Sequence, residues 1–168
     1  DNKVIKFYEE NKNKDSNIIT DTLLLAAGGA VGLVSHEMAH KFTGDLFGME
    51  CSYNPIKNPI ATYCKNDPKK NNNFEQVVFA GAGFAVQNII SAKIVNSDIK
   101  LKDNTFALGY LAFTMYNNTK SALSPDRHGI HGDVNGIADA GIPRSVIRLG
   151  LIASTLYLGN KVVDNLKN

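Results

Sequence analysis

Residues 23–48 read LLLAAGGAVGLVSHEMAHKFTGDLFG, and this stretch decides the fold of the chain. An apolar run passes into a polar segment with no proline between them, so we expect one helix from about residue 21 to residue 48. Thr20 or Asp21 would serve as its N-cap, and Gly48 would end it. A long helix is therefore the central element of the predicted fold.

Three glycines lie in the middle of this helix, at positions 28, 29 and 32. Glycine lowers helix propensity by about 1 kcal/mol relative to alanine, so three of them need a reason. A residue without a side chain lets another backbone come close. The glycines therefore predict close packing of a second helix against this one.

Helices dominate the rest of the chain as well. A loop over about residues 49–73 contains three prolines and is expected to hold short strands near Met49–Tyr53 and Ile60–Cys64. Further helices are predicted over about 74–96, over 104–121 with Asp103 or Asn104 as the cap, in a short piece from Asp133, and from Pro143 to about 165. The fold class is thus all-α, or nearly so.

Length and composition fit one globular domain that spans residues 1–168, with residues 1–18 as a frayed tail or a weak, charged helix. Hydrophobic residues make up 43% of the chain and charged residues 20%, which is the balance of a folded protein. Eighteen basic against sixteen acidic residues give a net charge of +2. This charge offers no electrostatic basis for nucleic-acid binding.

The first chemical signal is His36-Glu37-Met38-Ala39-His40, an HExxH sequence within the long predicted helix. Residues four apart share one helix face, so both imidazoles can reach one tetrahedral ion. Glu37 beside them can take a proton from an activated water. The alternative is a pair of surface histidines, but the flanking residues are too apolar for a solvated face.

The second signal is the segment SPDRHGIHGD at residues 124–133, which holds the other two histidines of the chain. A catalytic zinc takes three protein ligands and keeps one open position. Four side chains of this segment are candidates for the third ligand: Asp126, His128, His131 and Asp133. Glycines at 129 and 132 disfavour a regular helix here, which favours Asp133, with His131 as its rival because imidazole is a common zinc ligand.

The HExxH sequence resembles that of the zincin metallopeptidases. The wider stretch AAGGAVGLVSHEMAHKFTGDLFGMECSY, residues 26–53, is similar to the first core helix of the site-2 protease family. That family continues with a Gly-Pro-x-x-Asn helix and an Asp-Gly pair, where this chain has AGAGFAVQN at 80–88 and GIHGDVNG at 129–136. Here no proline follows Gly83, and Val134 replaces the glycine after the aspartate.

The resemblance implies a role for each matched position. His36 and His40 would be zinc ligands, Glu37 the general base and Asp133 the third ligand. Asn88, with Gln87 beside it, would contact the substrate or the oxyanion, although Asn88 lies one residue further along than the family pattern has it.

These observations predict a zinc-dependent metalloprotease that hydrolyses peptide bonds of a peptide or protein substrate. His128 or Arg127 is a further candidate for stabilising the tetrahedral oxyanion. The alternative is a non-catalytic metal-binding structural domain, or a protein-interaction domain of the cell envelope that uses loop 49–73. The same loop could instead be a lid over the active site.

Cys51 and Cys64 are the only cysteines in the chain. A disulfide between them would place the protein in an oxidising compartment, so an exported, periplasmic or extracellular location is expected; two reduced thiols are the alternative. The longest apolar stretches have about 10–13 residues, short of the roughly 20 that span a bilayer. Membrane association is therefore not favoured, though it remains an alternative.

Overall fold

The computed structural model describes residues 2–65, 73–124 and 132–167, and their side chains from residue 17 onward. In these ranges the chain is mostly helical with one small sheet, which confirms the all-α, or nearly all-α, prediction. The elements are α1 (Asn2–Leu46), β1 (Cys51–Asn54), β2 (Asn58–Cys64), α2 (Asn73–Val95), η2 (Leu101–Asp103), α3 (Thr105–Leu123), α4 (Asp133–Asp139) and α5 (Arg144–Lys167).

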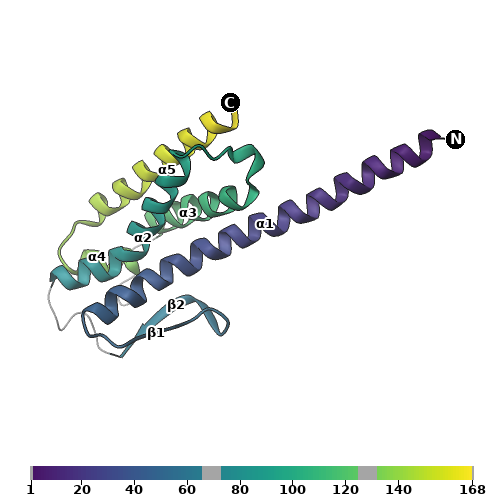
Figure 1. Ribbon diagram of the computed structural model, residues 1–168. Coiled ribbons are helices and arrows are strands. Elements are labelled where there is room, and N and C mark those ends of the chain that lie inside the picture. The colour runs from purple at the N-terminus through teal and green to yellow at the C-terminus, as the bar shows by residue number, and fades with distance from the viewer. Residues whose placement is uncertain (1, 66–72, 125–131, 168) are drawn as a thin grey trace.

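Helix α1 runs between the other helices on one side and the β1–β2 hairpin on the other, and its N-terminal part extends beyond them (Figure 1). It begins at Asn2, so the first residues continue the long helix and are not a separate frayed tail. After Leu46 the backbone turns at Gly48, whose positive φ of 73° suits a residue without a side chain. The predicted end of this helix is thus confirmed.

The glycines of α1 allow the close packing that the sequence predicts. A Cβ at Gly28 would overlap the backbone carbonyl oxygen of Phe106 on α3, and a Cβ at Gly109 would overlap that of Leu25 on α1. The two helices therefore meet backbone to backbone at this point. Gly32 lies against the ring of Phe113 on the same helix α3.

Strands β1 and β2 form an antiparallel hairpin in the predicted loop, with Cys51 opposite Cys64. These two cysteines are joined by a disulfide. The hairpin lies along the C-terminal part of α1 (Figure 1), where Gly44 leaves room for the Cys51 sulfur. The Thr62 hydroxyl donates a hydrogen bond of 2.8 Å to the backbone oxygen of Glu37.

Two apolar clusters lie among α2, α3, α4, α5 and η2, with a polar layer between them. One cluster contains Ala80, Phe84, Ala122, Ile137 and Leu151, and the other contains Val95, Leu101, Ala107, Leu111 and Leu158. Between them, Ser91 donates a hydrogen bond to Thr114, and Asn88 and Asn118 exchange hydrogen bonds. Because these buried polar groups are paired with one another, the layer joins the helices at little desolvation cost.

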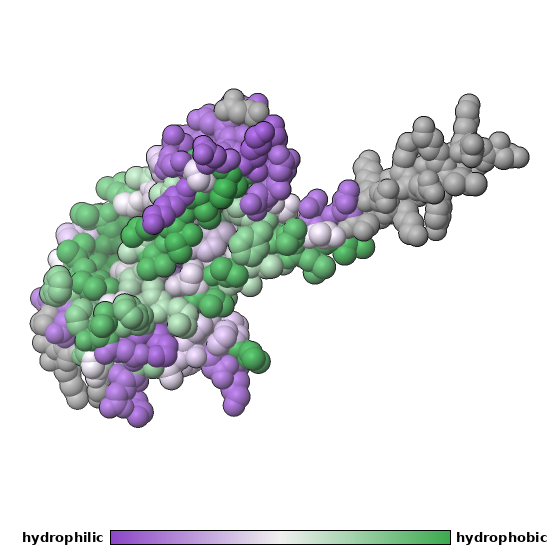
Figure 2. All heavy atoms as spheres, in the orientation of Figure 1, coloured by the Kyte–Doolittle hydropathy of each residue, from purple (hydrophilic) through white to green (hydrophobic). Residues whose placement is uncertain are grey.

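Much of the outer surface is apolar (Figure 2). Large exposed side chains on α1 and α5 include Leu23, Val31, Phe42, Leu46, Val146, Leu149, Leu156 and Val163. In the visible face of Figure 2, hydrophobic residues occupy the middle, and hydrophilic residues gather above and below them. A soluble domain rarely exposes so large an apolar area.

Three of the described helical segments are long and apolar enough to cross a membrane: Asn17–Leu46, Asn73–Val95 and Arg144–Lys167. This corrects the expectation that the apolar stretches are too short. One of those stretches, residues 77–86, ends before Gln87, whose amide in fact donates to the backbone oxygen of Gly32 on α1 inside the bundle. A polar residue that is satisfied in this way does not interrupt an apolar helix.

Candidate metal centre

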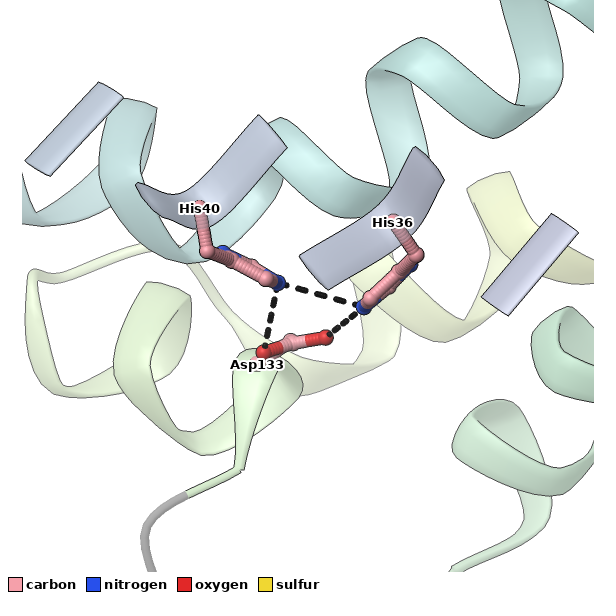
Figure 3. Close-up of side chains that lie close together, drawn as sticks. All are labelled: His36, His40 and Asp133. Carbon is pink, nitrogen blue, oxygen red and sulfur yellow. Dashed lines mark hydrogen bonds and ion pairs between the residues drawn. The ribbon is translucent and has the colours of Figure 1, made fainter. Parts of the chain in front are cut away.

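The HExxH turn of α1 brings two imidazoles together inside the protein. His36 and His40 are 5% and 4% exposed, and their Nε2 atoms lie 3.1 Å apart. The spacing of four residues places both rings on the face of α1 that is turned toward α2 and α4 (Figure 3). The predicted pairing of His36 and His40 is therefore present.

The outer nitrogen of each ring faces a carbonyl oxygen. His36 Nδ1 lies 3.0 Å from Oε1 of Gln87, and His40 Nδ1 lies 2.8 Å from the backbone oxygen of Phe79. A carbonyl oxygen can only accept, so Nδ1 of each ring carries the proton and donates. Each Nε2 is then left with a lone pair that points into the centre.

Asp133, the first residue of α4, completes the group (Figure 3). Its Oδ2 lies 2.8 Å from His36 Nε2, and its Oδ1 lies 3.3 Å from His40 Nε2. The three residues offer ligand atoms that all lie within 4.8 Å of one another. Asp133 is thus the third-ligand candidate that the structure places beside the two histidines.

These distances fit a tetrahedral metal site. Ligand atoms about 2.0–2.1 Å from a zinc ion in tetrahedral geometry lie roughly 3.3 Å from one another. Two imidazole lone pairs and a carboxylate repel each other at such separations unless a metal cation or a proton lies between them. As a deprotonated carboxylate, Asp133 would supply the negative charge of this ligand set, since a metal ligand must be deprotonated.

Glu37 is also buried, at 7% exposure. It follows His36 on α1, yet it is not a member of the three-residue group that converges in the described part of the chain. Its role as general base is therefore a prediction that rests on the HExxH sequence.

The other predicted site residues have different outcomes. The structure does not bring Asn88 to the centre, because its amide is bonded to Asn118, to Ser154 and to the backbone oxygen of Phe84. His131, His128, Asp126 and Arg127 lie outside the described residues. The N-cap of α4 is Gly132, and Asp133, the next residue, faces the histidines.

Sequence reasoning missed that one face of α2 lines the centre, and it gave Gln87 a contact with the substrate or oxyanion in place of its contact with His36. Phe79, Gly83 and Gln87 follow one another at intervals of four residues, and so form one stripe along that helix. The stripe supplies an acceptor for His40, a surface for the His36 ring and an acceptor for His36. The four-residue spacing of Phe79, Gly83 and Gln87 could have shown that these residues share one face of a helix. It could not show that this face packs against the histidines of α1.

Comparison with protein-family models, with curated proteins and with solved structures finds no match for this chain.

Proposed function

We propose that the protein is a zinc-dependent peptidase with His36, His40 and Asp133 as its metal ligands. The observation that carries the proposal is the convergence of these three donors beside Glu37 within an HExxH helix. Three ligands leave a fourth tetrahedral position for water or substrate, which is the arrangement of catalytic zinc. The substrate class that suits this chemistry is a peptide or protein amide.

The residues of the chain divide the work of hydrolysis. When bound, zinc would polarise the peptide carbonyl and lower the pKa of a water to about 7. Glu37 takes the proton of the attacking water and returns it to the departing nitrogen. Gln87 accepts from the His36 ring and the Phe79 carbonyl accepts from the His40 ring, which turns the Nε2 atom of each ring toward the metal position.

The metal content of purified protein tests the ligand set. Elemental mass spectrometry is expected to find about one zinc per wild-type chain and almost none in His40→Ala or Asp133→Ala, because two ligands rarely retain the ion. Asp139→Ala, which removes the other carboxylate of α4, is the matched control and should keep its zinc.

His131→Ala is measured in parallel and is expected to retain the metal. The reverse result, with zinc lost in His131→Ala and kept in Asp133→Ala, would make His131 the third ligand. Wild-type protein without stoichiometric metal, purified in the absence of chelators, would contradict the proposed function.

We also propose that the helical bundle lies in a bilayer. Three long apolar helical segments and the exposed apolar side chains of α1 and α5 support this placement. The ionisable groups His36, Glu37 and His40 are buried inside the protein, where charged and polar residues of membrane helices are found. The disulfide of the hairpin fits the oxidising side of an exported membrane protein.

Thiol labelling tests the bilayer placement. Leu156 on α5 is 63% exposed in the structure, so a cysteine there reacts with N-ethylmaleimide unless lipid covers it. In intact membranes, Leu156→Cys is expected to stay unlabelled and Asp98→Cys, in the connection after α2, to be labelled. Both should react after denaturation in detergent. Equal labelling without denaturation would contradict the proposal and favour a water-soluble exported domain.

A further inference from the structure

The Gln87 side chain of α2 is fully buried, and its hydrogen bonds reach α1, which carries two of the metal ligands, and α3. Its Nε2 donates to the backbone oxygen of Gly32 on α1 at 2.9 Å. Its Oε1 lies 3.0 Å from His36 Nδ1 and 3.0 Å from Nδ2 of Asn117 on α3. Because the Gly32 oxygen can only accept, the amide has one possible orientation, with Oε1 toward His36.

This orientation decides the tautomer of His36. Asn117 Nδ2 also lies 3.4 Å from His36 Nδ1, so an unprotonated Nδ1 would have a weak donor nearby. The same unprotonated Nδ1 would face the Gln87 Oε1 atom at 3.0 Å, and these two acceptors would repel each other. A protonated Nδ1 instead makes the shorter and better bond to Gln87. The lone pair of His36 therefore lies on Nε2, toward Asp133 and His40.

The steric contacts of the His36 ring do not by themselves decide which ring nitrogen points into the metal centre. The His36 ring lies against the backbone of α2 at Gly83, where a Cβ would overlap three ring atoms, and Phe84 meets the ring edge-on at 5.4 Å between centroids. These contacts fix the plane of the ring. A rotation of 180° about the Cβ–Cγ bond keeps the ring in that plane but exchanges Nδ1 with Cδ2 and Nε2 with Cε1. Nitrogen and carbon are nearly equal in size, so only a hydrogen-bond partner distinguishes the two orientations.

We propose that Gln87, restrained by Asn117, is a positioning residue that fixes the ring and tautomer of His36 for metal binding. The proposal rests on the metal-dependent function proposed above. For His40 the same task falls to the backbone oxygen of Phe79. For His36 it falls to a side chain, so this outer hydrogen bond can be removed by substitution. Loss of such a partner typically weakens metal binding by about 10- to 100-fold.

Zinc affinity of the purified full chain, measured by competition with a chromophoric chelator, tests the proposal. Gln87→Met keeps the side-chain length and removes the acceptor, and is expected to bind zinc about 10- to 100-fold more weakly. Gln87→Glu retains an acceptor toward His36 and should recover most of the affinity. Gln76→Met is the matched control, because Gln76 is a buried glutamine of the same helix whose amide donates to Gly136 and not to His36.

The outcomes separate this proposal from the function itself. Wild-type protein that binds no zinc contradicts the peptidase, whereas equal zinc affinity of wild type and Gln87→Met overturns the role of Gln87 alone. An equal loss in Gln76→Met would also overturn it, since the effect would then be a general loosening of α2. If Gln87→Met does not fold, Asn117→Leu decides: weaker zinc binding supports the proposal, and wild-type affinity contradicts it.

Discussion

Replacing Glu37 with glutamine is expected to leave about one zinc per chain and to lower peptide hydrolysis by at least about a hundredfold. Glutamine has the length and shape of glutamate, but it cannot take a proton from water. Glu37 is buried and directly follows the ligand His36 in the chain, and it is not part of the converging donor group, so its loss should spare the metal. Zinc content and the cleavage of fluorescent casein and quenched peptides in detergent micelles measure the two effects.

Glu75→Gln is the control for this experiment, because Glu75 lies in the first turn of α2 and outside the metal centre. It should keep both zinc and turnover. Substantial hydrolysis by Glu37→Gln would remove Glu37 from the role of base. Loss of zinc together with turnover would instead give Glu37 a part in holding the ion.

Gly28→Ala is expected to lower the free energy of unfolding by about 3 kcal/mol, the upper end of the range for overpacked sites. One added methyl group would overlap the Phe106 carbonyl oxygen and approach the Tyr110 nitrogen at 2.9 Å. Both are backbone atoms, so no side-chain rotation relieves the overlap, and α1 and α3 must separate. Chemical unfolding in detergent, followed by circular dichroism, measures the change.

The neighbouring glycine provides the matched control. At Gly29 the nearest atoms to an added Cβ are the Gly109 oxygen at 3.8 Å and the Phe113 Cβ at 3.9 Å, which are ordinary contacts. Gly29→Ala should therefore be neutral or slightly stabilising, since alanine favours the helix by about 1 kcal/mol. Equal stability of the two variants would show that α1 and α3 are not in backbone contact.

Local signals in the sequence were enough for most of the fold. Asn104 was one of two predicted caps, and its side chain accepts from the Ala107 amide at 2.9 Å. Pro143 directly precedes α5, and Gly48 ends α1, because each residue restricts or permits a particular backbone conformation. Such effects depend on a few consecutive residues and can be read without the tertiary structure.

The surface of the bundle was not predictable in this way. Whether Asn88 interrupts the apolar helix α2 depends on whether a partner satisfies its amide, and that partner is Asn118, thirty positions away on another helix. An estimate of apolar length from the sequence alone counts such a polar residue as if it were exposed to water. The sequence therefore indicated a soluble domain where the structure has three helical segments suited to a membrane.

The metal centre likewise has residues that could be predicted from local sequence and residues that could not. His36 and His40 were predictable because their spacing is a property of one helix. Gln87 and Asn117 reach His36 across 51 and 81 positions of the chain, through the register of α2 and α3 against α1. That register follows from the packing of whole helices, including the backbone contact at Gly28, and no short motif encodes it.

The attachment of the hairpin to α1 has a consequence for local opening of the structure. Thr62 is bonded to the Glu37 carbonyl, the Cys51 amide donates to Asp45 at 2.8 Å, and the disulfide lies on Gly44 between them. These attachments fall on the two turns that flank His40. Fraying of this end of α1 and release of the hairpin are therefore expected to be a single event with a single free energy, and hydrogen exchange should find the two elements in one cooperative unit.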